Sequence, residues 1–148
     1  MALVALAACS APATLPDLKI AETRADAGDI DGALAAYRSA QGKCSALTPK
    51  RRAVAACADA LLGEAELLER SGRTKEAIDA YLAIPARTTQ LADETTAAIA
   101  TFRAGELQLR AGQVTAAWTA LWRVVTDYPD EPTAADALRR LLEDGRGR

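Results

Sequence analysis

The sequence predicts an all-α protein, an α-solenoid of about three stacked helical hairpins. The main observation is a phrase that occurs three times: a glycine, four residues, an alanine, three residues and a large apolar side chain. The second is composition, because the 148 residues are half apolar, only 4% aromatic and very rich in alanine, the best helix former. A recurring phrase of this kind is typical of helical-repeat arrays, in which each hairpin buries its apolar face against its neighbours.

Each copy of the phrase predicts a helix, a tight turn and a second helix. The copies are Gly28–Ala33–Tyr37, Gly72–Ala77–Tyr81 and Gly112–Ala117–Leu121. The glycine can end the first helix because it adopts a positive φ without a Cβ clash. The alanine is small where two helices approach closely. The large residue four positions later lies on the same helical face and fills the space between them.

The first nine residues predict a lipoprotein signal. Residues 2–8 are wholly apolar and end in Leu-Ala-Ala-Cys9, which resembles a bacterial lipobox, whose cysteine is lipidated. The run is too short to span a membrane. No Lys or Arg precedes it, so either a basic segment lies upstream or the stretch is an alanine-rich leader with an incidental cysteine. Residues 10–16 are expected to form a stiff, proline-containing tether.

The predicted repeat domain spans residues 17–144. Within it, residues 57–71 carry the broad apolar face of a packed helix. Residues 131–144 predict a solitary final helix that begins near Pro132. Its polar outer face, as an end cap needs, would consist of Arg139, Arg140, Glu143 and Asp144. Residues 145–148 are expected to be a disordered tail.

The three copies resemble the tetratricopeptide repeat (TPR) family. The resemblance rests on the turn glycine and on the alanine followed four residues later by Tyr or Leu. The third copy adds Ala104-Gly105, where the family has a Leu-Gly step, and Pro129, where the family places its closing proline. The family's Trp and Tyr of the first helix are missing, and the glycines are 44 and 40 residues apart, against about 34 in the family. We therefore expect longer first helices, and longer loops before them, across the resemblance over residues 17–143.

The cysteines predict one disulfide. If Cys9 is lipidated, Cys44 and Cys57 remain as an even pair in an oxidising compartment. We expect Cys44 in the loop 42–50 and Cys57 on the following helix. A disulfide closing a loop of this length stabilises a protein by roughly 3 kcal/mol. The alternative is two independent buried thiols that act as small apolar side chains.

The composition argues against catalysis, cofactors, metals and nucleic acids. The chain contains no histidine, which removes the Ser-His and Cys-His pairs of many hydrolases. Two cysteines without a histidine cannot form a four-ligand zinc site. No glycine-rich phosphate-binding loop is present, and the net charge of −2 comes without a basic stripe. We therefore expect no enzyme activity, cofactor, metal or nucleic-acid partner.

The resemblance to TPR proteins implies a partner-binding groove along the first helices of the pairs. Six residues before each turn glycine stands a glutamate, and these three would form a row. The predicted groove residues are Glu22, Asp26, Glu66, Arg70, Phe102, Glu106 and Arg110. Chaperone-binding members of the family hold the terminal carboxylate of their partner in a clamp of side chains. The mixed charges of this chain differ from that clamp, and they favour a partly basic partner. The alternative is that Glu66–Arg70 and Glu106–Arg110 are i,i+4 pairs on the helix surface.

The two tryptophans lie one turn apart in the third copy. Trp118 directly follows the packing alanine and is expected in the core. Trp122 directly follows Leu121, a position that normally points outward. Either it packs under the final helix, or it is an exposed aromatic anchor of the kind enriched at interface hot spots.

These observations predict a non-catalytic protein–protein interaction module, an adaptor or assembly factor of the bacterial cell envelope. Its partner would be another protein or a peptide, bound along the groove. Ser10 is not the aspartate that retains lipoproteins in the inner membrane, so the lipid anchor at Cys9 implies the periplasmic face of the outer membrane. The alternatives are a periplasmic solute-binding accessory protein and, if Cys9 carries no lipid, a soluble cytoplasmic TPR regulator.

Overall fold

The computed structural model describes residues 16–44, 51–88 and 93–146. Within them lie seven helices and no strand: α1 (Pro16–Asp26), α2 (Ile30–Cys44), α3 (Arg51–Arg70), α4 (Thr74–Thr88), α5 (Glu94–Arg110), α6 (Val114–Asp127) and α7 (Pro132–Arg146). The predicted all-α fold is therefore confirmed. The lipidation signal, with Cys9, and the tether up to residue 15 lie outside the described residues.

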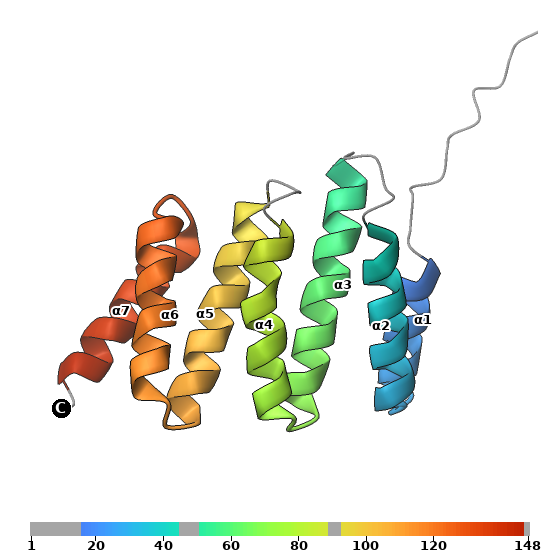
Figure 1. The fold of residues 1–148 in the computed structure, drawn as a ribbon, viewed down its shortest axis with the longest axis horizontal. Coiled ribbons are helices and arrows are strands. Elements are labelled where there is room, and N and C mark those ends of the chain that lie inside the picture. Colours follow the sequence, from blue (N-terminus) through green and yellow to red (C-terminus); the bar gives the residue numbers. More distant parts are fainter. Residues whose placement is uncertain (1–15, 45–50, 89–92, 147–148) are drawn as a thin grey trace, which may run out of the picture.

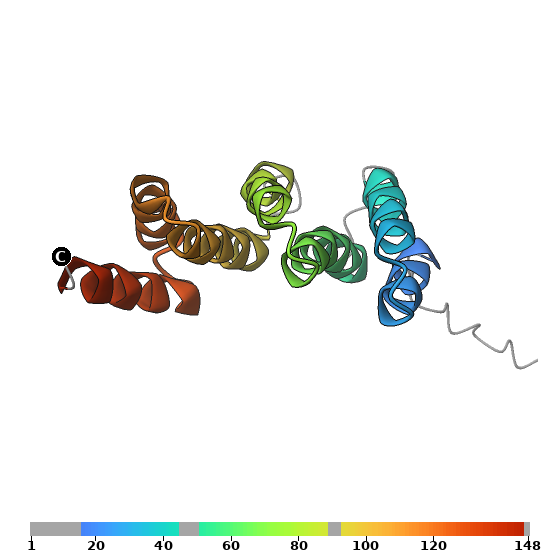
Figure 2. The ribbon, with the colours of Figure 1, turned by 90° about the horizontal axis from the view of Figure 1, so that it is seen from below.

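The helices stand side by side in chain order (Figure 1). Seen from below, they form two rows, a first-helix row of α1, α3, α5 and α7 and a second-helix row of α2, α4 and α6 (Figure 2). Each helix packs against the next one in sequence, and successive members of the first-helix row also touch. The contacts are therefore between neighbours in sequence, which explains why a local repeat can specify the fold.

The three turn glycines end α1, α3 and α5 in the same way. Gly28, Gly72 and Gly112 have φ of 79°, 76° and 73°. At the second turn, the N–H of Gly72 donates to the Glu69 carbonyl, and the N–H of Arg73 donates to the Leu68 carbonyl. The other two turns repeat both bonds, the pattern of a Schellman cap. The turn prediction is confirmed.

The packing residues of the phrase lie in the core. Ala33, Ala77 and Ala117 are fully buried, as are Tyr81 and Leu121, and Tyr37 is 5% exposed. One apolar cluster runs through α1 to α5 and a second joins α6 to α7, so the core extends along the row. The Tyr37 ring lies against the backbone at Gly63, where an added Cβ would come within 2.4 Å of it.

The extra residues between copies lengthen the first helices, as predicted. The first helix of the first copy, α1, has 11 residues, whereas α3 has 20 and α5 has 17.

A buried glutamine, Gln41, joins three helices by hydrogen bonds. The Gln41 amide on α2 donates to the Ala60 carbonyl and to Glu64 on α3, and its oxygen accepts from Arg87 on α4.

The structure joins Cys44 and Cys57 in a disulfide, with their Cα atoms 5.7 Å apart. The expected position of Cys44 in a loop is wrong, because α2 continues through it as its last residue. The bond therefore links the end of α2 to the fully buried Cys57 of α3. It connects the first hairpin to the second.

Two predictions for the C-terminal region are wrong. α7 continues through Gly145 to Arg146, into the expected disordered tail. Its outer face is also not uniformly polar, because Leu138 is 42% exposed and Leu142 is 52% exposed. Arg140, expected on that face, instead turns toward α5, where its Nε donates to Glu106 at 2.7 Å.

Candidate binding cleft

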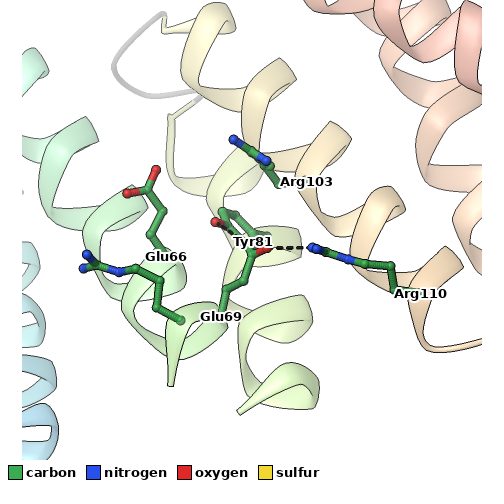
Figure 3. Close-up of a pocket in the computed structure, with 6 residues that line it drawn as sticks. Glu66, Glu69, Tyr81, Arg103 and Arg110 are labelled. Carbon is green, nitrogen blue, oxygen red and sulfur yellow. Dashed lines mark hydrogen bonds and ion pairs between the residues drawn. The ribbon is translucent and has the colours of Figure 1, made fainter. Parts of the chain in front are cut away.

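A cleft of about 550 Å³ opens between α3 and α5, with α4 behind it (Figure 3). Its lining residues are Glu66, Glu69 and Arg70 from α3, Tyr81 from α4, and Arg103 and Arg110 from α5. The α3 residues share one face because they are three and four positions apart, about one helical turn. The two α5 residues are seven apart, two turns of the same face.

Glu69 ties the three helices of the cleft together. Arg110 Nη2 donates to Glu69 Oε1 at 2.6 Å, and the Tyr81 hydroxyl donates to Oε2 at 3.1 Å. Tyr81 is fully buried, so its phenol closes the floor of the cleft. Burial, followed by the charge of Glu69, raises the pKa of Tyr81 well above its usual range.

Three charged side chains of the cleft have no ion-pair partner among the described residues: Glu66, Arg70 and Arg103. Glu66 and Arg70 are on α3 and are exposed, and Arg103 is exposed on α5. In Figure 3, Glu66 and Arg103 flank Tyr81 on opposite sides. The cleft therefore presents guanidinium and carboxylate groups that make no ion pair within the described residues, and such groups suit charged or hydrogen-bonding ligands.

A related arrangement surrounds Tyr37, the counterpart of Tyr81 in the first copy. Burial raises the pKa of Tyr37, and the charge of Glu22 on α1 raises it further. Asp26 and Glu66 act in the same direction, whereas Arg70 opposes them. Glu66 also raises the pKa of Tyr81, so it lies within electrostatic reach of both tyrosines. These charges form a strip along the first-helix row, acidic near α1 and rich in arginine near α5.

The structure brings only some of the predicted groove residues together. Glu66, Arg70 and Arg110 line the cleft, whereas Glu22 and Asp26 are not among its lining residues and act electrostatically on Tyr37.

Two predicted groove residues serve other contacts. Glu106 is held by Arg140 of α7. Phe102 packs against the α6–α7 core cluster and contributes nothing to the cleft lining.

The alternative i,i+4 pairing of the groove glutamates is wrong. Arg110 pairs with Glu69, on the neighbouring helix α3, and Glu106 pairs with α7. Glu66 and Arg70 make no ion pair within the described chain. The charges therefore connect different hairpins or remain open to a partner.

Sequence reasoning missed Glu69, Arg103 and the Tyr81 hydroxyl. Tyr81 was identified for packing, but its phenol also carries a hydrogen bond. Glu69 lies three residues after Glu66, and this spacing puts the two on one face of a helix. Arg103 carried no signal, because the copies differ at this position.

The prediction for Trp118 is wrong, whereas Trp122 agrees with one of its two alternatives. Trp118 is not a core residue: it is 38% exposed, and its Nε1 donates to Asp144 at 2.6 Å. Trp122 is 56% exposed, in agreement with the alternative of an exposed aromatic side chain. Both lie on α6 beside α7.

Over residues 16–44, 51–88 and 93–146, no helix is long and apolar enough to cross a membrane. The same residues contain no group of three or more His, Cys, Asp or Glu side chains placed to hold a metal ion. No family model, curated protein or solved structure matches the chain.

Proposed function

We propose that this protein is a non-catalytic TPR-type interaction module, an adaptor or assembly factor of the bacterial cell envelope. It would bind another protein or a peptide along its first-helix row. The observation that carries the proposal is the α3–α5 cleft, in which Glu69 holds the helices together while Glu66, Arg70 and Arg103 stay unpaired. Unpaired charges on rigid helices are ready to bind a partner without first breaking internal bonds.

The lining of the cleft supports a protein or peptide partner over a small solute. Pockets for small molecules are mostly apolar with few polar groups. Here five of the six lining residues are charged. The solute-binding alternative is therefore the weaker one.

The distribution of charge refines the expected partner. In the cleft, Glu69 and Arg110 neutralise each other, which leaves Arg70 and Arg103 against Glu66. This end favours an acidic segment, whereas Glu22 and Asp26 near α1 favour a basic one. We therefore propose a partner segment with both an acidic and a basic part, which extends the expectation of a partly basic partner.

A site-specific crosslinking experiment tests the proposal. Cells produce the chain with a photoreactive amino acid at Arg103, in the cleft, or at Leu82, an exposed position on the second-helix row. We expect position 103 to give a discrete adduct with another envelope protein and position 82 to give none. Adding Arg70→Glu, which reverses a cleft charge that would attract the acidic segment, should weaken the adduct. The proposal fails if the cleft position gives no adduct, or if both positions capture the same set of proteins.

A further inference from the structure

A largely apolar surface lies at the α7 end of the described chain, away from the cleft. Six large apolar side chains are exposed in the described residues, and four of them share this surface: Trp118, Trp122, Leu138 and Leu142. Together with Leu141 and Gly145 they line a groove of about 450 Å³ between α6 and α7. We call these six residues the terminal face. The other two exposed residues, Ile20 and Leu82, stand alone on α1 and α4.

The terminal face continues the interface that joins the hairpins. The residue after each packing alanine is large and apolar: Leu34, Ile78 and Trp118. Leu34 and Ile78 are 2% and 5% exposed, inside the cluster that joins successive hairpins. Trp118 occupies the same position in the last hairpin but is 38% exposed. The side chain at this position is therefore buried between hairpins in two copies and is partly exposed in the third.

The apolar side chains of α7 are also only partly buried. In the first-helix row, α3 packs between α2 and α4, and α5 packs between α4 and α6. α7 packs on α6 and α5, which bury Ala137 and Leu141. Leu138 and Leu142, each one position further along, remain about half exposed. An apolar surface of this kind marks an interaction site more often than chance exposure does.

We infer that the terminal face is covered by the terminal face of a second copy of this chain, in a two-fold dimer. A two-fold interface requires one surface that complements itself. This face holds both necessary parts: Trp122 stands out from α6, and the groove between α6 and α7 lies beside it. The indole of each copy can enter the groove of the other.

The charges at the edge of the terminal face fit a second copy. Arg123 pairs with Asp127 on α6, and Arg139 pairs with Asp136 on α7. Each of these four charges is already paired on its own helix, and Asp144 accepts from Trp118 Nε1, so two copies can meet without leaving an unpaired charge buried.

The exposed apolar side chains supply a substantial part of the area that a small dimer needs. The two indoles together expose nearly the equivalent of one whole tryptophan, on the order of 200 Å². Two copies would bury about twice this area from tryptophan alone. The leucines and the edge residues then extend the interface toward the roughly 1,200 Å² of small specific interfaces.

The test is the oligomeric state of the full chain, carrying Cys9→Ser so that no lipid is attached. Light scattering and sedimentation should show a concentration-dependent dimer in the micromolar range. Leu142→Glu should weaken dimerisation by about tenfold or more, because it buries an unpaired charge. Leu82→Glu, a matched change on α4, should leave the dimer intact. Circular dichroism verifies that both variants stay helical.

Tryptophan fluorescence gives a second readout. The chain has only two tryptophans, and both lie in the terminal face, so the emission reports on this surface alone. Emission should shift to the blue as the concentration rises, and Leu142→Glu should abolish the shift. A chain that stays monomeric throughout, or an oligomer that Leu142→Glu leaves unchanged, overturns the inference.

Discussion

Tyr81 shows how one side chain can serve both the core and the cleft. Its ring is fully buried among the helices, whereas its hydroxyl reaches Glu69 at the floor of the cleft. Glu69 in turn accepts from Arg110, so a single carboxylate joins α3, α4 and α5. A substitution at any of these three residues would leave the others with an unmet hydrogen bond or charge.

The raised pKa of Tyr81 leads to a prediction for alkaline solution. The unfolded chain releases the phenol proton near pH 10, whereas the folded protein retains it to higher pH. The stability that the protonated phenol contributes is therefore complete below pH 10 and is lost as the pH rises above it. Ultraviolet titration of tyrosinate should show Tyr81 ionising late, and only in company with unfolding. Burial also raises the pKa values of Tyr37 and Tyr128, so Tyr81→Phe should reduce the amplitude of the late ionisation without abolishing it. A Tyr81 that titrates near pH 10 in the folded protein would contradict the prediction.

At the scale of the helix and its cap, the three turns are interchangeable units. Each uses a glycine of positive φ and the same two capping bonds, all within six residues. The packing alanine then donates its N–H to the residue after that glycine, which starts the second helix. The elements are therefore determined locally, and a change in one turn should affect mainly its own hairpin.

Gly72→Ala tests this local control. An added Cβ would meet no atom within 4 Å, so any loss of stability comes from the left-handed backbone. We expect a loss of about 1–2 kcal/mol, measured by urea unfolding. Gly42→Ala is the matched control, because Gly42 lies within α2 and its Cβ would also meet nothing. There the alanine should stabilise by roughly 0.5–1 kcal/mol, and equal effects of the two changes would contradict our account.

For the whole molecule, stability comes from a chain of neighbour contacts with few long-range supports. Four ion pairs within the described residues join one hairpin to the next unit of the array: Arg38–Glu64, Arg73–Asp31, Arg110–Glu69 and Arg140–Glu106. The Cys44–Cys57 disulfide links the first two hairpins near the opposite end. The cleft and the terminal face lie at different places along this row and share no residue. Partner binding and dimerisation can therefore be disrupted separately.

The location of the molecule can be tested through Cys9. Its Leu-Ala-Ala-Cys sequence predicts lipidation and anchoring at the envelope. Cells that produce the chain behind its natural upstream sequence should incorporate a palmitate analogue into it and retain it in the membrane fraction. Cys9→Ser should remove both the label and the retention. Label that persists in this variant would show that the lipid, if any, is attached elsewhere.

The sequence alone determined the hairpins, because everything that makes them is local. The turn glycine, the packing alanine and the large residue four positions later act within one turn and its adjoining helices, and all three copies behave as predicted. The lengthening of α3 and α5 also followed from the spacing of the glycines.

Only the tertiary structure decided the contacts between hairpins. The carboxylates that bind Arg110 and Arg140 lie 41 and 34 residues away in the chain, so helix spacing alone suggested the wrong partner for Arg110 and for Glu106. The exposure of Trp118 and Leu142 likewise depends on whether another helix covers α6 and α7. Amphipathic patterns specify that a helix has an apolar face. Which neighbour covers that face, and how completely, is set by the distance and angle between packed helices.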